Sequence, residues 1–256
     1  MAHPVPTGEY AVGTFTYTVK DDRPEALDPS GMRRVASRVY YPVPKDRVAG
    51  CAKAKGLSRE MAEGIRKTFM FPLRYDRLEA AGENVSECYE NAPRPEGEKY
   101  PLILFSHGMG SYREGNSFLC IELASHGYVV ISVAHSREGI VTEFDDGTSV
   151  PFDRSITKKL YQPYLGGAVA ALKLTKAKGT PEELSAKFDA FQDRYCGFQK
   201  DRLEEWVRDT QASLAYAREN LSGMIDFGKG IGAAGHSSAG IRRTVCAPAA
   251  PTSSAA

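Results

Sequence analysis

The chain contains the run Tyr100-Pro101-Leu102-Ile103-Leu104-Phe105, which is continuously apolar. A short apolar run without alternation is typical of a strand that is covered on both faces. The stretch Ser106-His107-Gly108-Met109-Gly110 follows at once and predicts a tight turn. Residues 116–126 then have apolar side chains at helical spacing, with Asn116 as N-cap and Gly127 beyond the end. A second apolar run at 128–134 completes a strand–turn–helix–strand unit, which predicts a parallel sheet.

A third strand is expected at residues 230–234, after the most regular helical pattern in the chain. That helix, predicted over 199–221, has one apolar face made by Leu203, Trp206, Val207, Thr210, Leu214, Ala217 and Leu221. Its Lys, Arg and Glu residues are expected on a solvated face. Arg202, Arg208 and Asp209 could pair across the helix without any functional meaning. A hairpin turning at Asp146-Gly147 precedes a helical region over 155–198 that is broken at Gly179-Thr180-Pro181. Right-handed crossovers would place the three strands in one sheet with helices on both faces.

The N-terminal region predicts an antiparallel hairpin. Residues 10–19 and 34–43 alternate between apolar and polar positions, and Asp28-Pro29-Ser30-Gly31 supplies turn residues between them. Residues 45–98 are interpreted as an insertion with one weak helical patch around residues 61–70. We therefore expect a single α/β domain over residues 1–246. Residues 247–256 contain only Ala, Pro, Ser and Thr, a composition typical of a disordered tail.

The composition argues against a nucleic-acid-binding protein, a metal-binding protein and a membrane-spanning protein. The chain has 256 residues, and 33 Lys plus Arg against 32 Asp plus Glu leave a net charge of +1, so nucleic acid is not an expected partner. Five cysteines show no metal-ligand spacing, which favours ordinary thiols and no metal site. No apolar run approaches the length of a membrane span and no secretory signal is recognisable, so a cytoplasmic location is expected.

The candidate chemistry lies at the ends of two predicted strands. Gly235-His236-Ser237-Ser238-Ala239-Gly240 is a Gly-x-Ser-x-Ala form of the nucleophile elbow, in which a serine occupies a tight strand-to-helix turn. Open α/β sheets bind ligands at such strand ends. Ser237 is the candidate nucleophile for an ester carbonyl, and the backbone N–H groups of Met109 and Ser238 are the candidate oxyanion donors. The alternative interpretation is that both turns are only tight connections.

The other histidines and the residues after the first turn are weaker candidates. His107 and His236 are expected to brace the two turns rather than act as a base, and with Gly108 they are possible pocket residues. Tyr112 and Arg113 follow the first turn and are candidates for the pocket mouth. His126 and His135 end a helix and a strand, so capping or surface hydrogen bonds are expected for both.

Three segments resemble the platelet-activating factor acetylhydrolase family of α/β-hydrolases: Phe105-Ser106-His107-Gly108-Met109-Gly110, Leu123-Ala124-Ser125-His126-Gly127-Tyr128-Val129-Val130, and Gly235-His236-Ser237. The resemblance implies an α/β-hydrolase fold with a mostly parallel sheet and a serine esterase that needs neither metal nor cofactor. The implied substrates are short or oxidised acyl esters at the sn-2 position of phospholipids, or related small esters. By the same match Ser237 is the nucleophile, and Met109 and Ser238 hold the oxyanion.

The sequence departs from that family after the serine. In α/β-hydrolases the acid and the histidine follow the nucleophile, yet residues 238–256 contain no Asp, Glu or His. This predicts a chain truncated at the C-terminus, with the later strands missing and the strand at 231–234 left as a sheet edge. Two functions therefore stay open: a serine esterase whose acid and base are absent from this chain, and a non-catalytic binding protein that keeps the pocket.

Overall fold

The computed structural model describes residues 4–70 and 72–237, with the backbone only for residues 160–166. The chain divides into two compact units. The first comprises residues 1–152 and 207–256, and the second comprises residues 153–206. Ser238 and the predicted tail at 247–256 lie outside the described residues.

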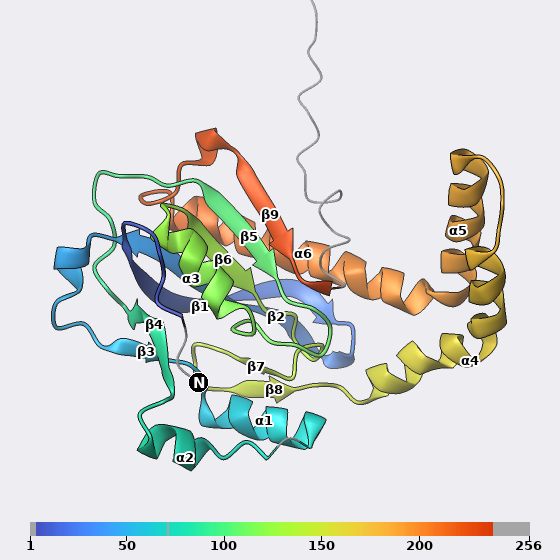
Figure 1. Ribbon diagram of the computed structural model, residues 1–256, viewed down its shortest axis with the longest axis horizontal. Helices are drawn as coiled ribbons and strands as arrows, with labels where there is room; N and C mark the ends of the chain where they lie inside the picture. Colours follow the sequence, from blue (N-terminus) through green and yellow to red (C-terminus); the bar gives the residue numbers. More distant parts are fainter. Residues whose placement is uncertain (1–3, 71, 238–256) are drawn as a thin grey trace, which may run out of the picture. The chain divides into compact units, whose positions relative to one another are not determined.

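The first unit contains a seven-stranded sheet in the order β3-β4-β1-β2-β6-β5-β9 (Figure 1). The predicted strands β5 (Leu102–Ser106), β6 (Val129–Val133) and β9 (Ile231–Gly235) are parallel neighbours, and β9 is the last strand of this order. Helix α3 (Ser117–Ser125) lies between β5 and β6 in the chain, and Gly127 follows it with φ of 90°. The predicted strand–turn–helix–strand unit is therefore confirmed.

The N-terminal hairpin is confirmed, but its turn is not where turn chemistry predicts it. β1 (Ala11–Glu25) and β2 (Asp28–Val43) pair as far as Glu25 opposite Asp28, so the chain reverses at residues 26–27. The predicted turn Asp28-Pro29-Ser30-Gly31 lies within β2 instead. The longer ladder brings Arg33 to Glu25, where the guanidinium donates to the carboxylate at 2.7 Å, and this contact favours the observed register.

Residues 45–98 contribute to the sheet rather than standing apart from it. They contain η1 (Lys45–Val48), β3 (Lys53–Lys55), α1 (Arg59–Phe69), α2 (Tyr75–Ala80) and β4 (Val85–Glu90). β4 pairs in parallel with β1, and β3 pairs with β4 at the other edge of the sheet. The predicted helical patch corresponds to α1, whose N-cap Ser58 accepts a hydrogen bond from the backbone N–H of Met61. After β6, the short strands β7 (Val141–Glu143) and β8 (Ser149–Pro151) form the predicted hairpin, with Gly147 at φ of 80°.

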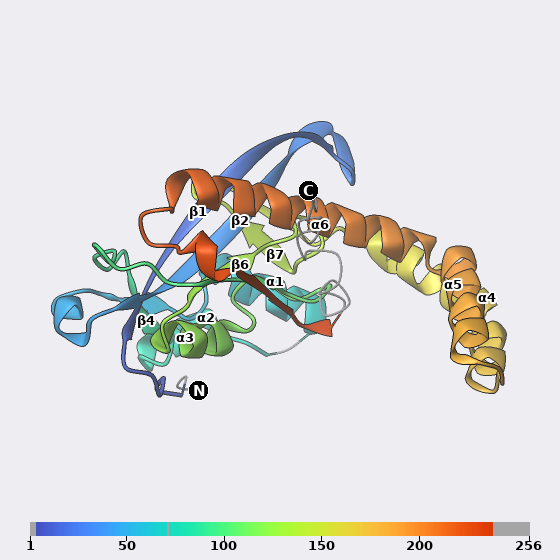
Figure 2. The ribbon, with the colours of Figure 1, turned by 90° about the horizontal axis from the view of Figure 1, so that it is seen from above.

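Two hydrophobic clusters cover the sheet from opposite sides. Val129, Ile131 and Val133 of β6 belong to one cluster, together with Ala217 and Leu221 at the end of α6 (Gly197–Asn220). Val130 faces the other way, into a cluster with Cys120, Ile121 and Ala124 of α3. Figure 2 shows α3 and the last turns of α6 on the two sides of the strands. The predicted sheet with helices on both faces is confirmed.

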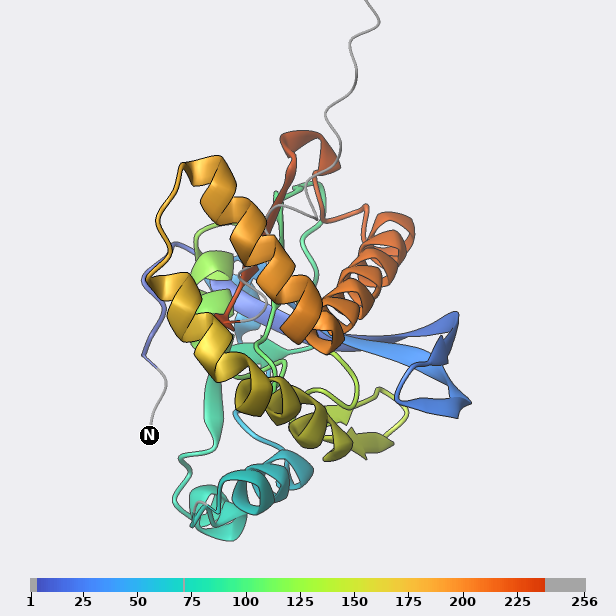
Figure 3. The ribbon, with the colours of Figure 1, turned by 90° about the vertical axis from the view of Figure 1, so that its right-hand side faces the viewer.

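The second unit contains α4 (Ser155–Thr175), α5 (Pro181–Tyr195) and the first turns of α6. The predicted break is confirmed, because Thr180 caps α5 by accepting from Glu183 N–H while the Glu183 side chain accepts from Thr180 N–H. Figure 3 shows α4 and α5, in olive to orange, running side by side. Within the described part of the chain, no helix is long and apolar enough to cross a membrane.

The central position of β6 generates a prediction about stability. Ile131 is fully buried between neighbouring strands, so Ile131→Ala should lower the free energy of unfolding by about 2–5 kcal/mol through lost burial and the cavity left behind. Met32→Ala is the matched control, because Met32 is 56% exposed and its truncation should cost under about 1 kcal/mol. Urea unfolding followed by circular dichroism measures both, and equal losses would contradict this assignment of the core.

Candidate active site

Ser237 has the backbone conformation of a nucleophile elbow. It lies two residues beyond Gly235, the last residue of β9, and has φ of 56°, in the left-handed region that non-glycine residues rarely adopt. Strain of this kind is concentrated at functional sites. The preceding residue, His236, donates its backbone N–H to the carbonyl of Ser106 at 3.1 Å, which fixes the elbow to the end of β5. Both His236 and Ser237 are exposed.

The glycine-rich turn of residues 106–110 lies against this elbow. Because the sequence predicts that this turn carries an oxyanion donor, it is called the oxyanion turn. Ser106 pairs with Gly235 in the parallel ladder, so both turns leave the sheet at the same end. A Cβ atom on Gly108 would lie 3.0 Å from the Ser237 Cβ and 3.2 Å from the His236 carbonyl oxygen. A side chain at position 108 would therefore push the turns apart. Met109 is half-buried beside this contact, and the second expected donor, Ser238, lies outside the described residues.

His107 is buried inside the oxyanion turn and is held as a neutral imidazole. Its Nε2 accepts the backbone N–H of His135 at 3.2 Å, so Nδ1 carries the proton and donates to the Gly108 carbonyl at 2.8 Å. Burial lowers the pKa of His107 to about 4, although the bond to Gly108 acts in the opposite direction. This side chain braces the turn, as the sequence predicts.

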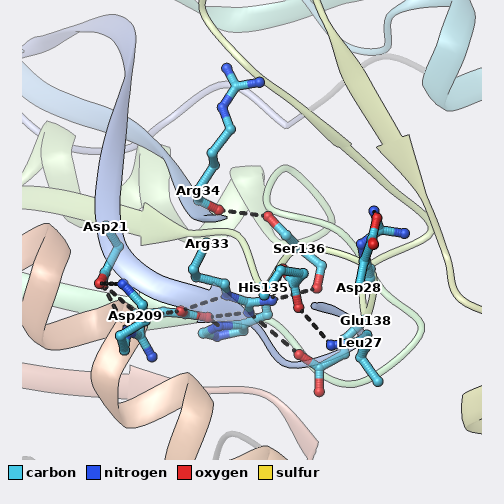
Figure 4. Close-up of polar contacts among 12 residues, drawn as sticks. Asp21, Leu27, Asp28, Arg33, Arg34, His135, Ser136, Glu138 and Asp209 are labelled. Carbon is cyan, nitrogen blue, oxygen red and sulfur yellow. Dashed lines mark hydrogen bonds and ion pairs between the residues drawn. The ribbon is translucent and has the colours of Figure 1, made fainter. Parts of the chain in front are cut away.

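A buried chain of polar contacts leads from the oxyanion turn to helix α6. The Ser106 hydroxyl lies 3.0 Å from His135 Nε2, and His135 Nδ1 lies 2.9 Å from Asp209 Oδ2. Arg33 of β2 donates twice to Asp209, from Nε at 3.0 Å and from Nη2 at 2.6 Å. Figure 4 shows the Asp209 carboxylate between His135 and Arg33. His135, Asp209 and Arg33 are almost completely enclosed.

The electrostatics of this chain keep Asp209 ionised. Burial alone would raise the pKa of Asp209, but the Arg33 guanidinium and the hydrogen bond from His135 hold it well below its usual range. Arg33 also contacts Glu25 at 2.7 Å and lies 3.5 Å from Glu138. A carboxylate and a guanidinium in bidentate contact form a strong, directional pair.

These contacts correct two expectations. His135 was expected to cap a strand end or bond at the surface, and Asp209 to pair along its own helix; both are wrong, because both side chains are fully buried and Asp209 pairs with Arg33 of β2. The expected solvated position of Arg202 is wrong as well, since Arg202 is only 5% exposed. His126 agrees with its expectation, since it is exposed and contacts Glu122 at 3.0 Å. Spacing along the chain does not reveal the His135–Asp209 pair, because 74 residues separate the two.

Tyr112 and Arg113 line a cavity of about 420 Å³. Its wall also includes Arg38, Glu114 and Glu143, and the described residues around it do not include Ser237 or Gly108. Burial alone would raise the pKa of Glu114, but Arg113 and Arg38 hold it below its usual range. Burial raises the pKa of Glu143. The wall of this cavity therefore carries paired charges of both signs.

The parallel strands, the helices on both faces and the sharp turn after β9 define the α/β-hydrolase class. A ferulic acid esterase from Streptomyces cinnamoneus has this fold with a TM-score of 0.59 at 19% identity, over 95% of this chain and 57% of that one. The chain belongs to the family of platelet-activating factor acetylhydrolase, isoform II, whose model matches residues 2–153.

Curated relatives align with shorter segments. A platelet-activating factor acetylhydrolase of Cavia porcellus is 50% identical over 54 residues, which are 21% of this chain and 12% of that protein. Another from Gallus gallus is 52% identical over 68 residues, which are 23% of this chain and 16% of that protein. The aligned segments thus span a small part of these relatives.

The neutral state of His107 predicts a pH dependence of stability. Its pKa of about 4 in the folded chain is below the ordinary value of 6.5, so the unfolded chain binds the proton more tightly. The contribution of His107 to the free energy of unfolding should be fully present above pH 6.5. It should fall as the pH drops toward 4, by about 3 kcal/mol in total.

Urea unfolding between pH 4 and 7 tests this by comparing the chain with His107→Gln. In His107→Gln, the decrease in the free energy of unfolding between pH 6.5 and 4 should be smaller by the contribution of His107. The control His126→Gln, at an exposed histidine, should show the same decrease as the parent chain. An unchanged slope in His107→Gln would show that the imidazole titrates freely.

Proposed function

We propose that this chain carries the nucleophile and the oxyanion turn of a serine ester hydrolase, and that the acyl-enzyme forms on Ser237. One observation carries the proposal: Ser237 holds a left-handed backbone conformation and packs against Gly108 at the end of two parallel strands. A turn that served only as a connection would not need a strained serine in that position. The family membership and the esterase fold support the same class of reaction.

In the proposed reaction, Ser237 Oγ attacks the ester carbonyl carbon and the carbonyl oxygen becomes an oxyanion. The backbone N–H groups of Met109 and Ser238 donate to that oxyanion. The intermediate then collapses, the C–O bond to the alcohol breaks, and the alcohol leaves with a proton. Water attacks the acyl-enzyme in the same way, releasing the carboxylic acid and restoring the serine.

The proton from Ser237 needs a base that has not been assigned. His107 does not fit this role, because its ring nitrogens are committed to hydrogen bonds with the Gly108 carbonyl and the His135 N–H. His135 is fully buried, with Nε2 on Ser106 and Nδ1 on Asp209. Residues 238–256 contain no Asp, Glu or His.

The proposed substrates are short or oxidised acyl esters of phospholipids, or related small esters. This choice rests on the relatives named platelet-activating factor acetylhydrolase, and the chemistry as proposed needs no metal or cofactor. Tyr112 and Arg113 are the proposed residues of the pocket mouth, because they follow the oxyanion turn in the chain and line a cavity of about 420 Å³. His107, Gly108 and His236 would form the floor around the nucleophile.

A second candidate is a non-catalytic binding protein that has the pocket and the elbow serine but does not hydrolyse a substrate. The hydrogen bonds of His107 and His135 favour it, because the ring nitrogens of both are engaged in buried contacts and not with Ser237. The two candidates differ in one property: an esterase needs a reactive hydroxyl on Ser237, whereas a binding protein does not.

A fluorophosphonate probe separates these candidates. The chain should be labelled on Ser237 and should release p-nitrophenol from p-nitrophenyl acetate, whereas Ser237→Ala should lose the label completely because no other serine has this geometry in the described residues. Ser222→Ala is the control, since Ser222 is an exposed serine in the same unit. Equal labelling of the chain and Ser237→Ala, or no labelling of either, would refute the esterase proposal.

A further inference from the structure

We propose that His135 and Asp209 are positioning residues that hold the oxyanion turn in place against the elbow. The proposal rests on the proposed function, in which that turn stabilises the oxyanion. Neither residue touches the reacting atoms. They act through the loop of residues 135–140, which follows β6 and packs on the turn.

The loop is joined to the turn region by three hydrogen bonds. The His135 N–H donates to His107 Nε2 at 3.2 Å, and the Gly110 N–H donates to the Glu138 carbonyl at 2.8 Å. The Ile140 N–H donates to the carbonyl of Ser111 at 2.8 Å. The turn is therefore enclosed between the loop and the elbow, which it meets at Gly108. The position of the loop sets the position of the turn.

The loop is in turn anchored to β2 and α6. His135 Nδ1 donates to Asp209 Oδ2 at 2.9 Å, and Arg33 Nη1 donates to the Ser136 carbonyl at 3.0 Å. The bidentate contact of Arg33 with Asp209 joins these two anchors. Arg33 and Asp209 have almost no exposed area, so water does not compete for their hydrogen bonds.

Ser106 links the same anchors to the elbow. Its hydroxyl contacts His135 Nε2 at 3.0 Å, while its carbonyl accepts the His236 N–H at 3.1 Å. The order Ser106, His135, Asp209 repeats the atom pattern of a catalytic triad. Ser106, however, is only 7% exposed and pairs in the β5–β9 ladder, so its hydroxyl serves as a tether and not as a second nucleophile.

Such a network matters because oxyanion donors act only when they are held within about 0.5 Å of the productive geometry. A displacement of about 1 Å costs roughly a hundredfold in rate. The turn has few side chains with which to hold itself, since two of its five residues are glycine. The buried contacts around Asp209 supply the missing rigidity from outside the turn.

The test compares Ser106→Ala and Asp209→Asn with Ser132→Ala in the full chain. Ser132 is a matched control: it is a fully buried serine on the adjacent strand β6, and its hydroxyl donates to the Arg113 carbonyl at 2.7 Å, outside the His135 contacts. The rate of Ser237 labelling by a fluorophosphonate is the first readout. We expect Ser106→Ala and Asp209→Asn to slow it roughly ten- to hundredfold, and Ser132→Ala to change it by less than about threefold.

The second readout does not depend on activity. Spectra of the chain with ¹⁵N-labelled histidine should show His107 with protonated Nδ1 and unprotonated Nε2, and both test variants should change these signals while Ser132→Ala should not. The proposal would be overturned if Ser106→Ala and Ser132→Ala changed the labelling rate equally. It would also be overturned if neither test variant changed the His107 signals. If Asp209→Asn does not fold, the labelling rate and the histidine spectra of Ser106→Ala test the proposal on their own.

The two proposals fail in different ways. An unlabelled parent chain refutes the esterase, yet the histidine spectra still show whether the network holds the turn. A labelled parent with unaffected test variants refutes the positioning role and leaves the esterase intact.

Discussion

The buried contact between Arg33 and Asp209 is the interaction on which the arrangement of the site depends. It joins strand β2 to helix α6 inside the first unit. Both residues also form hydrogen bonds with the loop after β6. An enclosed ion pair is not by itself a source of stability, because taking two charges out of water costs about as much as their attraction returns. Here the ion pair fixes the orientation of the groups around it. Asp209 fixes the ring of His135, and Arg33 fixes the backbone of Ser136.

The second constraint is the close approach of two backbones at Gly108. Parallel pairing of β5 with β9 brings two turns to one end of the sheet, but their separation is set by the absence of a side chain at this position. The oxyanion turn is thus fitted between the elbow on one side and the loop of residues 135–140 on the other. Long-range contacts on both sides hold a segment that is too rich in glycine to hold itself.

The sequence predicts those parts of the structure whose cause is local. The apolar runs that become β5 and β6, the helix α3 between them and the sharp turn at Ser237 follow from periodicity and turn chemistry. β3 and β4 escape prediction because they are short and carry charged residues, such as Lys53 and Glu87, at an edge of the sheet. His135 and Asp209 escape it for another reason. A charged residue on a helix is usually solvated, and nothing near either residue in the chain marks the partner that buries it.

Positions 108 and 109 of the oxyanion turn differ in what the structure requires of their side chains. A Cβ atom at position 108 would lie 3.0 Å from the Ser237 Cβ, so a side chain there requires the neighbouring atoms to shift by a few tenths of an ångström. Met109 is only half-buried, and the group proposed to contact the oxyanion there is a main-chain N–H that every residue except proline possesses. A substitution at position 109 other than proline therefore keeps this N–H group, whereas a substitution at position 108 disturbs the contact with the elbow. In the proposed esterase, the side chain at 109 is thus separable from the group that stabilises the charge.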